Sequence, residues 1–263
     1  MEVHLLFNSF NKMLSYQFEA VLPTQIIFLS NMASVYPSLV QVLPVMDMAK
    51  LVTLTLDSLG MEQEHGRERS KQLHRAALQA ARAAVTSELW SDAASRRLLL
   101  PACLDHVRQH LQSRTEIPEA IGLILEVVRL LKADKGREEE GWGQDVITLA
   151  EKCIGPLGIA IVVEQEVSEH EEDLGPASLI SALMGILELL TPSPHHQLWR
   201  ADPGLLSRLF TVLSEVMARP PFPAEWMSLR LAVAVTVSSS LQQAGNCLHY
   251  LTFDKQLWMA YFQ

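Results

Sequence analysis

The stretch RPPFPAEWMSLRLAVAVTVSSSLQQAGNCLHYL, residues 219–251, decides between three structures for this chain. Its centre, RLAVAVTV, has the composition of a buried strand, a membrane span or part of a soluble helix. A membrane helix needs about 20 consecutive apolar residues. The apolar run 231–237 is much shorter, and Arg230 and a run of serines flank it. The membrane interpretation is therefore rejected, and strand and soluble helix are left.

Helical spacing explains more of this stretch than strand spacing does. Residues 230–237 alternate between apolar and small or polar side chains, as in a β-strand. At steps of three or four residues, a much longer apolar stripe appears: Trp226, Leu229, Val233, Val237, Leu241, Ala244 and Leu248. Pro220 and Pro221 end the preceding segment, and Pro223 suits the first turn of a helix. We therefore predict a soluble helix here.

The same period recurs along the whole chain and predicts an all-α fold with no sheet. Helices are expected at roughly 3–18, 24–43, 46–59, 70–87, 92–113, 117–133, 144–166, 176–191, 203–218, 223–249 and 253–262. Prolines at positions 37, 44, 101, 118 and 156 are expected to kink or split these segments.

Helix pairs spaced about 40 residues apart are typical of armadillo or HEAT arrays. We predict one helical-repeat domain, an α-solenoid segment, over residues 1–263, with an acidic connector near 164–175. A closed all-α domain is the alternative.

Composition excludes several classes of partner. The chain has a formal net charge of -9, so it would repel nucleic-acid phosphates and anionic lipids. Only 19% of the residues are charged, below the roughly 25% that is usual for soluble domains, which indicates helices covered on more than one side. Cys103, Cys153 and Cys247 form no disulfide framework, and the N-terminus lacks a signal peptide. We therefore expect a cytoplasmic protein with protein partners.

A candidate zinc site lies in CLDHVRQH, residues 103–110. Cys103, His106 and His110 share one face of the predicted helix, and thiolates and imidazoles are zinc-type ligands. A fourth ligand is missing, as is the glutamate of HExxH, so ordinary surface or partly buried histidines are favoured. His195 and His196 receive the same interpretation.

The remaining candidate sites also favour a structural role. The segment from Glu164 to Asp173 has six carboxylates in ten residues, but it lacks the spacing of an EF-hand and is expected to be a solvated connector. The arginines of residues 65–75 suit either an acidic partner or a charged helix start. Ser238–Ser240 has no assignable base. The sequence thus nominates no catalytic, cofactor-binding or metal-ligating residue and no cofactor.

The end of the chain resembles the dedicator-of-cytokinesis family. The residues that carry the resemblance follow "LSEVMARPPF" and are Pro223, Trp226, Met227, Arg230 and Leu231, with Phe253, Leu257, Trp258, Tyr261 and Phe262 in "FDKQLWMAYF". The resemblance is to the helical-repeat region upstream of the catalytic domain of these guanine-nucleotide exchange factors, and it extends over about 205–263. The helix at 232–251 is richer in small residues than the family pattern.

The resemblance implies a role in activating Rho-family GTPases, typically Rac. Family members do this through a C-terminal exchange domain and use a C2-like domain for phosphoinositides, and neither domain is recognisable here. The chain is therefore expected not to be an enzyme by itself. Two functions stay open: a scaffold segment of such an exchange factor, and an independent helical-repeat adaptor that binds a peptide or protein in its groove.

The last residues, LWMAYFQ, form an aromatic helix face without a stop signal. Because repeat arrays normally close with a polar cap, we expect this chain to be a fragment that stops within an array.

We predict that Trp226→Ala lowers the free energy of unfolding by about 3–5 kcal/mol, because the indole fills the core of the array. Trp258→Ala should cost less, since its covering neighbours are expected beyond the chain end. Denaturant melts of both variants in a longer chain measure this. An unchanged midpoint for Trp226→Ala, together with lost binding to a partner, would instead make Trp226 a partner contact.

Overall fold

The structure is a computed structural model of the chain and describes residues 2–16, 18–59, 67–134, 141–167 and 175–190. All regular structure in these residues is helical, which confirms the predicted all-α fold. The predicted helices that fall in the described residues begin and end within about four residues of their expected bounds. The helices expected at 203–218, 223–249 and 253–262, with Trp226 and Trp258, lie outside the described residues.

The chain divides into two compact units, Met1–Val127 and Val128–Gln263, so each unit is described by itself. The helices that lie wholly in the first unit are α1 (Glu2–Leu14), η1 (Glu19–Val21), α2 (Leu22–Val40), α3 (Val45–Asp57), α4 (Arg67–Val85), η2 (Glu88–Trp90) and α5 (Ala93–Ser113). Helix α6 (Ile117–Asp134) crosses the boundary. In the second unit α7 (Trp142–Val167) packs against α8 (Gly175–Leu189). The single domain over 1–263 with an acidic connector stays a prediction.

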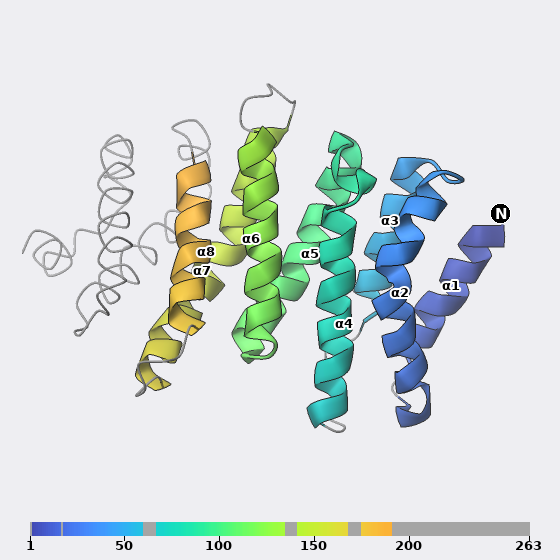
Figure 1. The fold of residues 1–263 in the computed structure, drawn as a ribbon, viewed down its shortest axis with the longest axis horizontal. Coiled ribbons are helices and arrows are strands. Elements are labelled where there is room, and N and C mark those ends of the chain that lie inside the picture. Colours follow the sequence, from blue (N-terminus) through green and yellow to red (C-terminus); the bar gives the residue numbers. More distant parts are fainter. Residues whose placement is uncertain (1, 17, 60–66, 135–140, 168–174, 191–263) are drawn as a thin grey trace, which may run out of the picture. The chain divides into compact units, whose positions relative to one another are not determined.

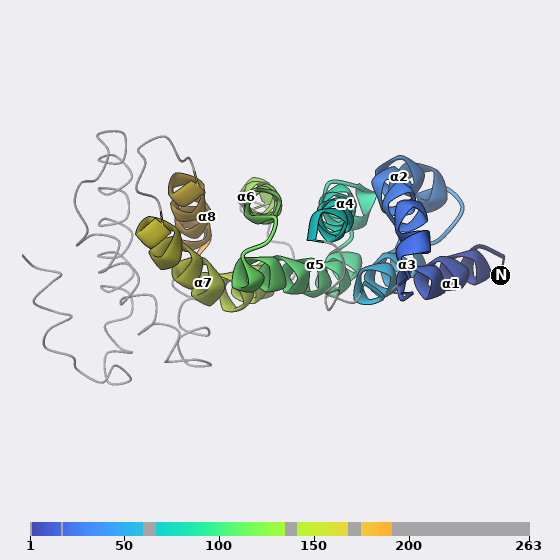
Figure 2. The same ribbon diagram turned by 90° about the horizontal axis from the view of Figure 1, so that it is seen from below.

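The first unit is built from two layers of helices. Helix α1 packs on α3 and α3 on α5 in one layer, and α2 packs on α4 in the other (Figures 1 and 2). Contacts between helices two steps apart in the chain are what stacked helix pairs produce. The unit is therefore an all-α helical repeat, as the periodicity predicts.

Local sequence explains where several helices begin and end. Asp92 caps the start of α5, because its Oδ2 accepts a hydrogen bond from the Ser95 backbone N–H at 2.7 Å. Pro44 precedes α3 and separates it from α2. Helix α5 ends at Ser113, and the following residue, Arg114, adopts the left-handed conformation with φ 57°. That conformation costs a residue with a Cβ roughly 1–2 kcal/mol, so the surrounding contacts must hold the turn.

Prolines were expected to kink or split the helices, but three of them do not split the helix that contains them. Pro37, Pro101 and Pro156 lie inside α2, α5 and α7, which continue on both sides of them. An internal proline removes one backbone hydrogen bond and costs about 3 kcal/mol. Helices α5 and α7 bury apolar residues both before and after their prolines, for example Leu99 and Val107 in α5. In α2 the buried residues all precede Pro37. We attribute the continuity of α5 and α7 to this packing.

Small residues set the spacing between helices in both units. In α4 the buried face is largely alanine: Ala76, Ala77, Ala80, Ala81 and Ala84. In the second unit, Gly185 of α8 lies against Val128 of α6. A Cβ built on Gly185 would lie 2.9 Å from Val128 Cγ1, closer than carbon atoms approach without a shift. Gly185 is therefore required by packing rather than by backbone conformation.

We predict that Gly185→Ala lowers the free energy of unfolding by roughly 1–3 kcal/mol, because the added methyl group overpacks the contact with Val128. Gly122→Ala in α6 is the matched control. Its Cβ would be 3.7 Å from the Arg82 guanidinium, an ordinary contact. The control should gain about 0.5–1 kcal/mol from helix propensity.

Urea unfolding of the two variants and of Gly185→Ala combined with Val128→Ala measures the effect. The second substitution should recover part of the loss by making room for the methyl group. Equal gains in stability for Gly185→Ala and Gly122→Ala would contradict the close packing of α8 on α6.

Candidate functional site: a polar joint between α4, α5 and α6

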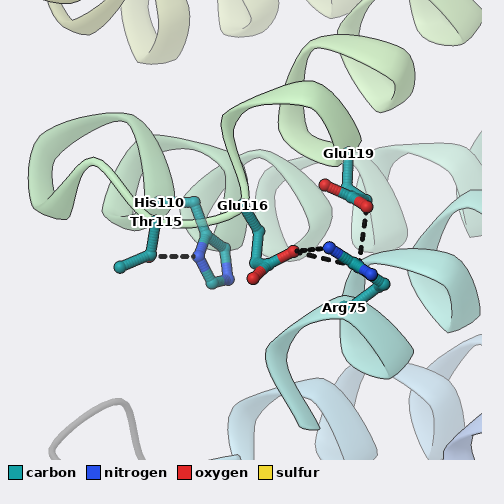
Figure 3. A network of polar contacts seen from close by, with 5 residues as sticks. All are labelled: Arg75, His110, Thr115, Glu116 and Glu119. Atoms are coloured by element: carbon teal, nitrogen blue, oxygen red, sulfur yellow. Dashed lines mark hydrogen bonds and ion pairs between the residues drawn. The ribbon is translucent and has the colours of Figure 1, made fainter. Parts of the chain in front are cut away.

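Polar side chains gather in the first unit where α5 turns into α6. We call this group the polar joint: His74 and Arg75 of α4, His106 and His110 of α5, and Thr115, Glu116 and Glu119 of the turn and of α6. Figure 3 shows its part around Arg75 and His110. The turn is tight, because both Arg114 and Thr115 donate backbone hydrogen bonds to the His110 carbonyl oxygen. Glu116 also has a positive φ, of 47°.

Arg75 ties α4 to the start of α6 through two carboxylates. Its Nε lies 3.0 Å from Glu116 Oε2 and 2.8 Å from Glu119 Oε1, and its Nη2 lies 3.0 Å from Glu116 Oε2 (Figure 3). The Glu116 side chain is only 5% exposed, whereas that of Arg75 is 54% exposed. A buried carboxylate needs a paired charge. Arg75 supplies it, and in doing so holds the turn in its strained conformation.

The three histidines, which we call the histidine cluster, join α3, α4 and α5. His106 Nε2 donates a hydrogen bond to the Leu56 carbonyl oxygen of α3 at 2.9 Å. His110 Nδ1 lies 2.9 Å from the hydroxyl oxygen of Thr115. The rings of His74 and His110 meet edge to face, with centroids 5.1 Å apart. The cluster thus connects helices that are far apart in sequence.

Burial keeps these rings neutral at pH 7. Desolvation lowers the pKa of all three histidines below the usual 6.5 and lowers that of His110 to about 4. Repulsion from His106 further lowers the pKa of His74, and repulsion from His74 and His106 further lowers that of His110. For His106, the hydrogen bond to Leu56 and the carboxylates of Asp57 and Asp105 act in the opposite direction but do not outweigh burial.

The candidate zinc ligands lie in the core rather than at the surface. Cys103, His106 and His110 are all buried in α5, so the expectation of surface or partly buried histidines was wrong about their exposure. Among the described residues, no three histidine, cysteine or acidic side chains are placed so that they could hold a metal ion. Burial raises the pKa of the Cys103 thiol to about 12, which leaves it protonated and a poor nucleophile.

Other candidates from the sequence are placed as follows. Arg75 forms ion pairs with Glu116 and Glu119 of its own chain, whereas an acidic partner was one of the two expectations for this segment. Cys153 is buried in α7. Helix α7 runs to Val167, so the first residues of the Glu164–Asp173 segment are helical. The rest of that segment, and Cys247, His195, His196 and Ser238–Ser240, lie outside the described residues. That no residue is catalytic or binds a cofactor stays a prediction.

Sequence reasoning missed His74, Glu116 and Glu119. The histidine follows buried Leu73 on the apolar side of α4, which was the one available signal. No local pattern marks the two glutamates, because their partner, Arg75, is distant in the sequence. It lies 41 residues from Glu116.

Further polar contacts tie helix edges within each unit. In the first, Arg82 Nη2 of α4 lies 3.9 Å from Glu126 Oε2 of α6. In the second, Lys132 of α6 pairs with Glu188 of α8, and the Trp142 indole N–H donates to the Leu131 carbonyl oxygen at 2.9 Å. Exposed ion pairs contribute little stability each, so they mainly set which helix edges meet.

Stacked helix pairs, the alanine face of α4 and the polar joint define an all-α helical-repeat segment. The family model described as the dedicator of cytokinesis (DOCK) TPR region matches residues 1–263. The chain belongs to this family, which confirms the resemblance found at its C-terminal end and extends it over the whole sequence.

Curated relatives support the assignment. The chain is 25% identical over 263 residues to "Dedicator of cytokinesis protein 3" of Mus musculus, which covers 93% of this chain and 13% of the relative. It is 24% identical over 265 residues to "Dedicator of cytokinesis protein 4" of the same species, covering 92% of this chain and 13% of the relative. The chain thus spans about an eighth of the length of these relatives.

We predict that Arg75→Met lowers the free energy of unfolding by roughly 1–3 kcal/mol, because it leaves the buried Glu116 carboxylate without its partner. Methionine keeps the apolar stem, so mainly the charge is tested. Arg82→Met is the matched control, on the same helix and similarly exposed. With its carboxylate 3.9 Å away, it should cost less than about 1 kcal/mol. Urea unfolding measures both, and equal losses would contradict the role given to Arg75.

Proposed function

We propose that this chain is a helical scaffold segment of a dedicator-of-cytokinesis-type guanine-nucleotide exchange factor in Rho/Rac small GTPase signalling. The observation that carries the proposal is the match of the family's TPR region to all 263 residues. The segment itself lacks the exchange domain and acts by holding other modules of the parent protein at set positions. It uses no cofactor.

The described helices suit a scaffold because their contacts resist bending. Between α4 and α6, a buried carboxylate is paired across the joint by Arg75. In the second unit, α8 has no room for a methyl group where it meets Val128. Packed interiors of this kind deform little and transmit position from one helix pair to the next.

Partners and location follow from the parent family and from charge. Protein partners, a Rho/Rac-family GTPase and an adaptor, are engaged through the full-length parent, and the net charge of -9 disfavours nucleic acid. In the part of the chain that the structure describes, no helix has the length and apolar character to cross a membrane. We propose a cytoplasmic location without direct membrane insertion.

The alternative is an independent helical-repeat adaptor that binds a peptide or protein. The repeat packing of the first unit favours this as a second candidate, since stacked helix pairs present extended surfaces for partners. The two functions differ in what the reading frame encodes after Gln263: further helices and an exchange domain in the first case, a stop in the second.

A segment exchange tests the scaffold function. The matching residues of "Dedicator of cytokinesis protein 3" are replaced by this chain, and release of labelled GDP from Rac is measured. We expect the chimera to accelerate GDP release, and the isolated chain to leave it at the intrinsic rate. A chimera with a flexible glycine-serine linker of equal length is the control and should lose activity, because it cannot hold the modules in place.

Two results would contradict the proposal. One is equal activity of the linker control, which would show that no scaffold is needed. The other is a reading frame that ends at Gln263 together with peptide binding by the isolated chain, which would establish the adaptor.

A further inference from the structure

In the described part of the chain, each ring of the histidine cluster has one buried nitrogen without a hydrogen-bond partner. These nitrogens are His74 Nε2, His106 Nδ1 and His110 Nε2. A neutral ring tolerates one such nitrogen as an unprotonated acceptor, at a modest cost. A protonated ring has an N–H at both positions and would bury a charge without an acceptor. Each ring is therefore compatible with its site only in the neutral form.

The same rings hold helices together. His106 holds the end of α3 through the Leu56 carbonyl oxygen, His110 holds the turn into α6 through Thr115, and His74 of α4 contacts the His110 ring. We infer that the histidine cluster is an acid-sensitive lock, which joins α3, α4, α5 and the turn into α6 while its rings are neutral and opens when one is protonated. This concerns the chain's own fold and does not depend on the proposed function.

The surrounding charges leave this conclusion in place. Asp57 at the end of α3 and Asp105 of α5 favour protonation of His106, but burial outweighs them. Arg75 is adjacent to His74, and the carboxylates of Glu116 and Glu119 are engaged by Arg75. Two other ionisable groups nearby, the Cys103 thiol and the Tyr36 hydroxyl of α2, are buried and have raised pKa values, so they stay neutral in acid.

The sign of the pH dependence follows from linkage. Because the histidines have lower pKa values folded than unfolded, the opened or unfolded state takes up protons first. Stability is full above about pH 6.5, the unfolded value, and falls with pH toward the folded value of about 4 for His110. Each ring that gains a proton only on opening raises the opening equilibrium up to about tenfold per pH unit in this window.

Hydrogen exchange of the full chain, read by mass spectrometry at about pH 7 and about pH 5, tests the lock. Amide protection is corrected for intrinsic exchange and compared between α4–α5 and α7–α8, because the two latter helices contain no histidine. We expect protection in α4 and α5 to fall at least about tenfold more than in α7 and α8.

Variants assign the effect to the cluster. His74→Phe keeps a flat ring against His110 and removes one titrating group and its unpartnered nitrogen, so the differential loss should shrink severalfold. His4→Gln, at an exposed position of α1, is the matched control and should lose as much protection as the unsubstituted chain. If His74→Phe does not fold, proton NMR titration of the unsubstituted chain decides: midpoints below 6.5 for the cluster rings support the lock.

The lock is overturned by any of three results. Protection in α4–α5 and α7–α8 could fall equally, His74→Phe could lose as much protection as His4→Gln, or the cluster rings could titrate at or above the ordinary histidine value.

Discussion

The burial of the alanine face of α4 is the constraint on which the first unit depends. Helix α4 packs against α2 in its own layer and against α5 in the other, so its small residues set the spacing in both directions. Larger side chains at these positions would push the layers apart, because packed cores have little free volume. The same close approach brings His74 against His110 and places Arg75 within reach of the start of α6. The polar joint is thus a consequence of apolar packing.

The polar joint in turn explains a costly piece of backbone. Arg114 and Glu116 both adopt positive φ values although neither is a glycine, and such conformations persist only where the surroundings hold them. Here Thr115 is held by His110, and Glu116 and Glu119 are held by Arg75. Separating a buried ion pair leaves an uncompensated charge, so such a pair disfavours arrangements that move its two partners apart. We therefore regard the joint as the feature that selects how α6 leaves α5.

These properties suit the scaffold role that we propose. The family match covers the whole chain, and the chain covers 13% of the relatives that it resembles. A scaffold has to keep its helix pairs in register. If the inferred lock operates, this register in the first unit depends on the histidine rings staying neutral, which would couple the shape of the proposed scaffold to the acidity around it.

The sequence by itself determined the helices, most of their ends and the family. Helical periodicity and capping are local, so α5 could be placed from its apolar stripe and α3 from Pro44 before it. Tertiary structure alone decided that Pro101 stays inside α5, that His106 and His110 are buried, and that Arg75 meets Glu116. The physical reason is that these outcomes depend on which helix faces meet. Residues 41 positions apart find each other only through the packing of helices between them, and no local pattern encodes that distance.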